Sequence, residues 1–200
     1  PKINLNTIMQ FVSRPSWCLN MMTAKKLNFG NIMGHVTNVT NLSSLASWTA
    51  DQFDPTLTWE DIAWIKDRWK GKLILKGIMD SEDAMLAVKA GADAIIISNH
   101  GGRQLDGAPS TISVLPEIVD AVNSKVEVHF DGGVRSGQDV LKALALGADC
   151  IHIGRPYVYG LGAKGQEGVE IAIEIIKKEL DLTMAMCGET NISNVGLHNL

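Results

Sequence analysis

Residues 91–98 of the chain read GADAIIIS, and residues 147–154 read GADCIHIG. In both copies a Gly-Ala-Asp turn precedes a mostly apolar run, and a helix-like alternation of Ala or Leu with polar residues precedes the turn. A short, almost entirely apolar run is typical of a parallel strand covered on both faces. The two copies therefore predict a duplicated unit of helix, turn and buried strand.

Four such strands are expected, at residues 73–77, 94–98, 126–131 and 150–154. Helices are expected between and after them, at 81–90, 112–122, 139–146 and 167–180. Strands that alternate with helices predict an α/β fold with a parallel sheet. A TIM (β/α)8 barrel has eight strands and needs about 250 residues. We therefore expect residues 71–200 to form the C-terminal half of such a barrel, with about four β/α units that correspond to strands 5–8.

The remaining residues, 1–70, are expected to form a helical and loop excursion that leads into the barrel. Its predicted parts are helices at 4–12, 15–22 and 58–69 and a polar loop at 28–45. Residues 1–50 carry four basic side chains and no acidic one, whereas the rest of the chain holds 14 basic and 22 acidic residues. This uneven charge predicts a separate surface role for the first segment.

Composition narrows the class of protein. The 200 residues are 46% hydrophobic and 20% charged, which is typical of a soluble globular chain and argues against disorder. No apolar run approaches the roughly 18 residues that predict a membrane span. The cysteines Cys18, Cys150 and Cys187 are odd in number and far apart. Their spacing matches neither a disulfide framework nor a zinc motif, so we expect no metal and a reducing compartment.

Two glycine-rich loops follow the third and fourth predicted strands. Residues 131–137 read DGGVRSG, and residues 154–156 read GRP. Glycines let backbone N–H groups approach an anion, a helix start adds partial positive charge, and arginine offers a two-pronged donor. Because the loops after the last two strands form the usual phosphate site of these barrels, we expect phosphate binding here. The alternative is that these are ordinary turn glycines beside surface arginines.

Chemistry is also expected where the first two strands end. His100 lies two residues beyond the second strand, and Arg103 follows across Gly101 and Gly102. A neutral histidine can accept a proton and an arginine can hold a carboxylate, although a loop histidine is more often structural or solvated. Lys76 ends the first strand, where burial is costly unless an anion meets it. It is either a Schiff-base nucleophile or a fixed cation beside an electron-rich cofactor.

At these residues the chain resembles the FMN-dependent L-2-hydroxy acid dehydrogenases and oxidases. The resemblance spans about residues 30–190 and is carried by LKG at 75–77, SNHGGRQLD at 98–106, DGGVR at 131–135 and GRP at 154–156. Residues 45–55, LASWTADQFDP, are most similar to the bacterial respiratory L-lactate dehydrogenases in this family. The resemblance implies FMN as cofactor and oxidation of a small L-2-hydroxy acid, most simply L-lactate to pyruvate.

The resemblance also implies roles for individual residues. His100 would be the active-site base, which takes the substrate hydroxyl proton, or the α-proton in a carbanion scheme, while two electrons reach flavin N5. Arg103 would hold the substrate carboxylate, Lys76 would lie near the flavin N1–C2=O edge, and Ser98 would contact the flavin. The residues implied to bind the ribityl phosphate are Asp131, Gly132, Gly133, Arg135, Gly154 and Arg155.

Part of the family's site has no counterpart here. The tyrosines that touch the substrate and the acid that pairs with the catalytic histidine belong to the first four strands of the barrel. Tyr157 and Tyr159 are the only tyrosines, and they follow the phosphate loop. We therefore expect a fragment or a partial gene product that could be inactive alone. A half barrel would also expose two sheet edges, which favour pairing or aggregation.

Partners and location are implied in the same way. The substrate would be a small 2-hydroxy acid, the electron acceptor a quinone or cytochrome, and the intact protein a homo-oligomer that binds no nucleic acid. The location would be cytoplasmic, with peripheral contact at the inner face of the plasma membrane as one option. Residues 1–30 combine basic and apolar side chains, which suits anionic lipid, although an active-site lid would have the same composition.

Two other functions stay open on the sequence. One is another phosphate-binding barrel enzyme similar to IMP dehydrogenase, which shares the Asp-Gly-Gly and Leu-Gly-Ala-Asp patterns. That enzyme needs a catalytic cysteine in a Gly/Ser-rich loop, and none of the three cysteines has this context. The other is a non-catalytic half barrel that binds a phosphate ligand or a partner chain.

Overall fold

A computed structural model describes residues 4–24, 32, 36 and 42–200. The chain divides into two compact units, Pro1–Leu57 and Thr58–Leu200. Helix α4 (Trp59–Arg68) belongs to the second unit, because Trp59 packs against the core beside the sheet and Lys66 pairs with Asp93 at 2.7 Å. The expected functional boundary at residue 70 stays a proposal.

The first unit holds three helices, α1 (Leu5–Val12), α2 (Pro15–Thr23) and α3 (Leu42–Asp51). The side chain of Asn4 caps α1 by accepting a hydrogen bond from the Thr7 N–H at 2.9 Å. The predicted loop at 28–45 lies mostly outside the described residues. Its last residues, 42–45, belong to α3, so that part of the prediction is wrong. The Asn- and Ser-rich composition there concealed the start of a helix.

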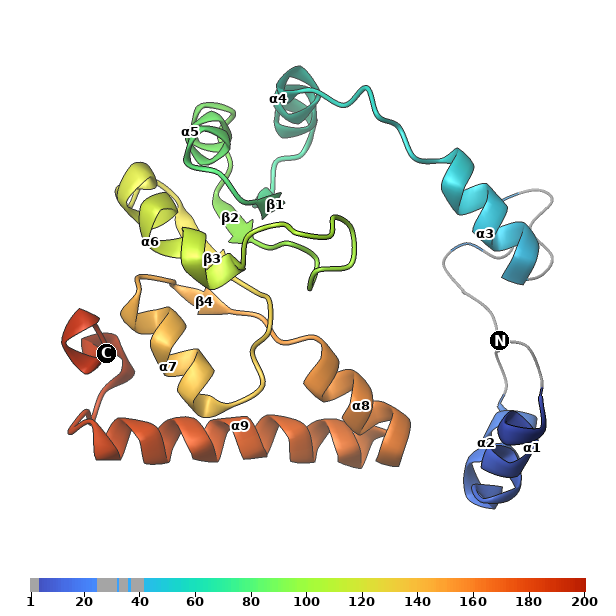
Figure 1. Ribbon diagram of the computed structural model, residues 1–200. Coiled ribbons are helices and arrows are strands. Elements are labelled where there is room, and N and C mark those ends of the chain that lie inside the picture. The colour runs from blue at the N-terminus through green and yellow to red at the C-terminus, as the bar shows by residue number, and fades with distance from the viewer. Residues whose placement is uncertain (1–3, 25–31, 33–35, 37–41) are drawn as a thin grey trace. The chain divides into compact units, whose positions relative to one another are not determined.

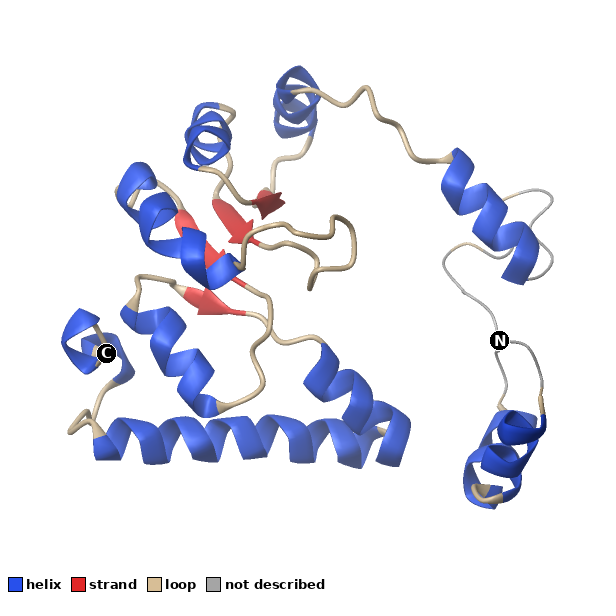
Figure 2. Ribbon diagram, viewed as in Figure 1, coloured by secondary structure: helices blue, strands red, loops and turns tan. Residues whose placement is uncertain are grey.

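The second unit is built on a four-stranded parallel sheet in the order β1-β2-β3-β4. The strands are β1 (Ile74–Ile78), β2 (Ala94–Ile97), β3 (Glu127–Phe130) and β4 (Cys150–Ile151). Figures 1 and 2 show the connecting helices on one side of the strands: α5 (Ser81–Lys89), α6 (Thr111–Val122) and α7 (Gly137–Ala145). This confirms the predicted half of an α/β barrel, although β4 has two residues where five were expected.

The repeated Gly-Ala-Asp turn has the same structure in both copies. Gly91 and Gly147 have φ values of +79° and +99°, which favour glycine. The carboxylate of Asp93 accepts a hydrogen bond from the N–H of Leu73 at 2.9 Å, and that of Asp149 accepts one from Val128 at 2.7 Å. Each aspartate therefore ties the turn before one strand to the start of the neighbouring strand.

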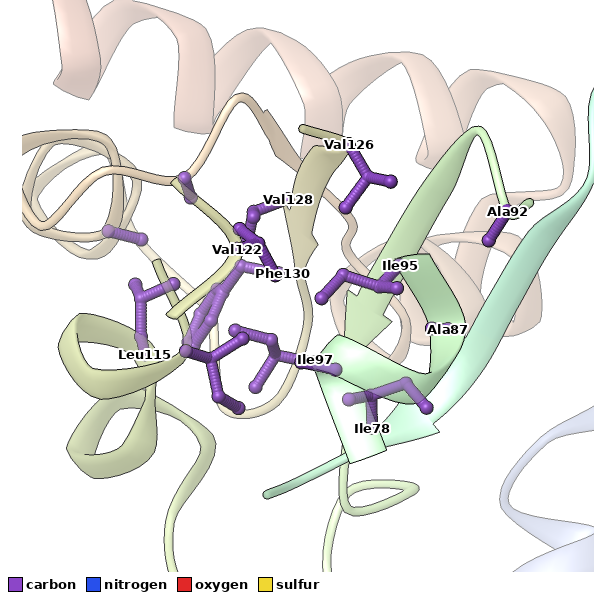
Figure 3. Close-up of a cluster of buried hydrophobic side chains, with 14 of the residues drawn as sticks. Ile78, Ala87, Ala92, Ile95, Ile97, Leu115, Val122, Val126, Val128 and Phe130 are labelled. Carbon is purple, nitrogen blue, oxygen red and sulfur yellow. The ribbon is translucent and has the colours of Figure 1, made fainter. Parts of the chain in front are cut away.

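The hydrophobic core lies between the strands and their helices. Figure 3 shows Ile95 and Ile97 of β2 beside Val128 and Phe130 of β3, with Leu115 of α6 packed near them. The side chains of Ile95, Ile97 and Leu115 are fully buried. Because side chains alternate along a strand, the intervening residues of these strands face the opposite side of the sheet. That second face leads to the polar residues at the strand ends.

Two further helices follow the sheet, α8 (Arg155–Lys164) and α9 (Gln166–Met186). They are followed by the short 3-10 turns η1 (Ile192–Asn194) and η2 (Leu197–Asn199). Helix α8 was not expected, because Pro156 and the glycines within it are typical of a loop. Pro156 is tolerated because it lies in the first turn, where its N–H needs no helical partner. Within the described ranges, none of the helices combines the length and the apolar composition that a membrane span requires.

Candidate active site

The predicted site residues converge on one cavity of about 490 Å³ at the C-terminal ends of the strands. Nine of the ten residues line it, and Ser98, the tenth, is buried and contacts the lining residue Lys76. The nine are Lys76, His100, Arg103, Asp131, Gly132, Gly133, Arg135, Gly154 and Arg155. Lys76 and Arg155 share this site although they are 79 positions apart in sequence. The reason is that the carboxyl ends of parallel strands lie at the same edge of the sheet.

Lys76 lies between partners from the two neighbouring strand ends. Its Nζ atom donates a hydrogen bond to Ser98 Oγ at 2.9 Å and is 3.7 Å from Asp131 Oδ2. Ser98 Oγ also accepts a hydrogen bond from the His100 N–H at 3.2 Å. The cation and the histidine loop are thus joined through a single buried hydroxyl. These contacts are those of a positively charged group held between a neutral acceptor and an anion.

The His100 loop has an unusual backbone. His100 has φ +57°, and Gly101 and Gly102 have φ +68° and +73°. A left-handed conformation is uncommon for a residue with a side chain, and such strain gathers at functional sites. Asn99 holds the turn, because its backbone and side-chain oxygens accept hydrogen bonds from the Gly102 N–H at 3.0 and 3.1 Å. His100 therefore lines the cavity from a sharp turn that the Asn99–Gly102 hydrogen bonds hold in place.

The loop after β3 lies close to the start of α6. Gly132 and Gly133 have φ +111° and +83°, and a Cβ on Gly132 would lie 2.5 Å from Thr111 Oγ1. Asp139 fixes the far end of the loop, where its carboxylate accepts hydrogen bonds from the N–H groups of Arg135 and Ser136. Burial alone would raise the pKa of Asp139, but these hydrogen bonds hold it below its usual value. The loop is thus a glycine cradle anchored to the start of α7.

The loop after β4 contributes Arg155 and the start of helix α8 to the cavity. Gly154 precedes α8, and Arg155 occupies the first helical position. A Cβ on Gly101 would lie 3.2 Å from Arg155 Nη2, so the His100 loop and the Arg155 side chain are close neighbours. The cavity is lined by four lysine or arginine side chains and one carboxylate, Asp131. Such a lining favours anions, and a phosphate and a carboxylate are the simplest pair to fill it.

Two further polar side chains belong to the cavity wall and were not predicted from the sequence. His152 lines the cavity from beyond the end of β4, and Tyr157 lines it from α8. Burial chiefly, and then the neighbouring His129, lowers the pKa of His152. The signal for His152 was its position in the second Gly-Ala-Asp copy, where it takes the place of Ile96 in the first copy.

Comparisons with known proteins agree with this geometry. The model of the family described as FMN-dependent dehydrogenase matches residues 1–200. The L-lactate dehydrogenases of Vibrio cholerae serotype O1 (strain M66-2) and Allorhizobium ampelinum are 41% and 42% identical over 201 residues. Each match covers 100% of this chain and 53% of the relative. The chain therefore spans about half the length of the curated relatives it matches.

Solved structures show the same likeness. A monotopic membrane protein, (S)-mandelate dehydrogenase, has a TM-score of 0.88 and 34% sequence identity, over 98% of this chain and 51% of that chain. A mandelate oxidase has a TM-score of 0.72 and 46% identity, over 78% of this chain and 45% of that chain. The neighbours support the barrel-half fold of the second unit, and the likeness to (S)-mandelate dehydrogenase extends over nearly the whole chain.

Proposed function

The chain belongs to the FMN-dependent dehydrogenase family, and from this premise we propose that it forms the half of a flavin site that binds the FMN phosphate and the substrate carboxylate. The reaction is oxidation of a small L-2-hydroxy acid, L-lactate to pyruvate, which is the substrate class named in the curated relatives. The observation that carries the proposal is the single cationic cavity in which His100, Arg103 and the two glycine loops meet.

The residues present fit FMN. A Cβ on Gly133 would meet open space, so this glycine leaves room for a ligand at the end of β3, whereas Gly132 lets the loop pass close to Thr111. Arg135 and Arg155 offer donors for a phosphate. Ser98 and Lys76 would lie toward the flavin ring, with Asp131, Gly132, Gly133, Arg135, Gly154 and Arg155 around the ribityl phosphate. When bound, FMN supplies the acceptor for the two electrons that leave the substrate.

Three side chains of this chain carry the remaining chemistry. Arg103 pairs with the substrate carboxylate and so fixes which way the hydroxyl points. His100 takes the proton from that hydroxyl as a general base. Lys76, which contacts Ser98 and Asp131, would place a cation in the cavity lining, where it can stabilise negative charge that develops during the reaction. In this proposal Lys76 is a fixed cation and not a Schiff-base nucleophile.

A turnover assay tests the proposal. The chain is co-expressed with the amino-terminal half of a curated L-lactate dehydrogenase, and reduction of an artificial dye is followed with L-lactate and with (S)-mandelate. We expect turnover with L-lactate, and we expect His100→Gln to lower kcat by about 100-fold or more while FMN stays bound. Turnover that His100→Gln leaves unchanged would contradict the assigned base.

A non-catalytic flavin- or phosphate-binding chain is the second candidate. The observation that favours it is that the chain spans about half of its relatives. The same assay separates the two, because FMN binding without turnover in any combination supports the non-catalytic function. The family match leaves no support for the alternative similar to IMP dehydrogenase.

We also propose that α1 and α2 contact a membrane surface. Their apolar side chains lie open to solvent, with Leu5 and Val12 76% exposed and Met22 84% exposed. Phe11 and Trp17 stack at 5.8 Å between ring centroids. The neighbour called a monotopic membrane protein matches 98% of this chain, which supports the same role here. Aromatic and apolar residues beside basic ones are typical of interfacial helices.

Vesicle sedimentation tests the membrane contact. We expect the chain to bind anionic vesicles more than neutral ones, with binding that weakens as salt rises. Val12→Asp with Met22→Asp should reduce the bound fraction, because both place charge on the apolar surface. Met186→Asp is the matched control, since Met186 is 79% exposed on α9. Binding that ignores salt, or that falls equally in the control, would contradict the proposal.

A further inference from the structure

His152, which lines the cavity, and two side chains next to it have no role in the proposed flavin chemistry. His129 of β3 lies against Cys150 and His152, which come from β4 and the residue after it. One ligand atom from each of the three residues lies within 4.8 Å of the others. We propose that His129, Cys150 and His152 bind one zinc ion through two imidazole nitrogens and a thiolate.

The strand register places these groups together. His129 pairs directly with Cys150 across the parallel β3–β4 ladder, and His152 lies two residues farther along, on the same face. His129 Nδ1 and His152 Nε2 are 3.1 Å apart. Two nitrogens that each lie about 2.0–2.1 Å from a tetrahedral zinc ion are roughly 3.3 Å apart. The histidine pair therefore has nearly the spacing that zinc requires, before any adjustment of the side chains.

Glu127 prepares His129 as a ligand. Its Oε2 atom is 3.2 Å from His129 Nε2, which is the ring nitrogen on the far side from His152. A carboxylate at this position favours a proton on Nε2, and the lone pair of Nδ1 then faces His152 and Cys150. Ligand histidines typically donate their second ring nitrogen to a carboxylate, which fixes the ring and raises its basicity.

The thiol of Cys150 is available for coordination. Cys150 forms no disulfide, and its Sγ atom makes no hydrogen bond to any residue that the structure describes. Zinc binding would release the thiol proton and leave a zinc–thiolate bond. Two imidazoles and one thiolate suit zinc and exclude magnesium and calcium, which prefer oxygen ligands. Three protein ligands leave a fourth position for water or another small ligand.

The sequence did not predict this zinc site, because only the spacing between the three cysteines was compared with known zinc motifs. A zinc motif with two ligands from each of two short segments would be visible as paired cysteines and histidines. Here the ligands come from neighbouring strands, at positions 129, 150 and 152, and only the β3–β4 register joins them. This proposal does not depend on the flavin function, because its readout is metal binding.

Cobalt substitution tests the site. The 200-residue chain is freed of metal with a chelator and titrated with Co²⁺, which replaces zinc and is coloured. We expect one equivalent to give the intense d–d bands of four-coordinate cobalt and a thiolate-to-cobalt charge-transfer band. Addition of Zn²⁺ should bleach both. Cys150→Ser should remove the charge-transfer band, whereas Cys187→Ser, the matched exposed cysteine, should leave it unchanged.

A second variant keeps the test decisive if Cys150→Ser fails to fold, which far-UV circular dichroism reports. The Glu127 side chain is 71% exposed, so Glu127→Gln spares the fold. It should weaken cobalt affinity by about 10- to 100-fold, because it removes the partner of a ligand histidine. The absence of a four-coordinate cobalt spectrum in the wild-type chain would overturn the proposal. A charge-transfer band that survives in folded Cys150→Ser would overturn it as well.

Discussion

At the residue scale, single polar side chains at the strand ends determine what the sheet can bind. Lys76 meets Ser98 and Asp131, and Ser98 in turn meets His100. The sequence predicted these residues as separate members of a site, each placed by its strand. It left the role of Lys76 open, because the choice between nucleophile and fixed cation depends on which groups surround it. Those contacts are properties of the folded sheet and not of the spacing.

Asp93 supports a prediction about pH. Its carboxylate is held by Lys66 at 2.7 Å, by the Leu73 N–H at 2.9 Å and by Lys72 at 2.9 Å. The hydrogen bonds from Lys66, from the Leu73 backbone and from Lys72 lower the pKa of Asp93 well below its usual range. Because the folded-state pKa lies below the unfolded value, this carboxylate stabilises the fold above the unfolded pKa. That contribution is lost as pH falls through the folded pKa.

We therefore expect Asp93→Asn to lower the urea midpoint of unfolding at pH 7. The difference in urea midpoint between the variant and the wild type should narrow as the pH is lowered. The wild-type carboxyl group then becomes protonated and is neutral, as the asparagine amide is at every pH. Asp67→Asn, at an exposed aspartate on α4, is the control and should leave the midpoint nearly unchanged. A gap that stays constant from neutral to acidic pH would show that the charge of Asp93 contributes nothing.

At the element scale, the repeated helix–turn–strand unit accounts for what could be predicted. Strands β1, β2 and β3 lie within one or two residues of their expected positions. Their positions were predictable because each strand is an apolar run, and turn residues, often glycine, lie close to its ends. Two α-helices, α3 and α8, were not predicted, because their residues are also typical of loops. Helix α8 depends on tertiary packing, where Gly160 of α8 and Gly168 of α9 bring the two backbones together.

Glycine substitutions in α8 test that packing. A Cβ on Gly160 would overlap the backbone of Gly168, whereas a Cβ on Gly162, in the same helix, would meet open space. We expect Gly160→Ala to lower the free energy of unfolding by about 1–3 kcal/mol. Gly162→Ala should leave it unchanged or raise it by up to about 1 kcal/mol, because alanine favours helix. Equal effects of the two changes in urea denaturation would mean that α8 and α9 do not pack this closely.

At the scale of the whole molecule, the second unit is an open four-stranded sheet with the candidate active site at the ends of its strands. In the described part of the chain, β1 and β4 each pair with a single neighbouring strand, so the sheet has two edges. The chain spans about half the length of the curated relatives it matches. The quinone or cytochrome acceptor, the homo-oligomer and the cytoplasmic location remain predictions.

The proposed function depends above all on the two glycine loops, which with Arg135 and Arg155 would bind the phosphate of FMN. The most direct test compares FMN with riboflavin, which lacks the phosphate, by flavin fluorescence titration of the 200-residue chain. The comparison is repeated with Arg135→Ala plus Arg155→Ala, and with Lys164→Ala at an exposed position on α8 as the control.

We expect the wild type and Lys164→Ala to bind FMN at least tenfold more tightly than riboflavin, since charge-assisted hydrogen bonds to phosphate contribute about 1.5–3 kcal/mol each. The double variant should bind FMN and riboflavin with similar, weak affinity. Equal affinity of the wild type for the two flavins, or a double variant that still prefers FMN tenfold, would contradict the claim.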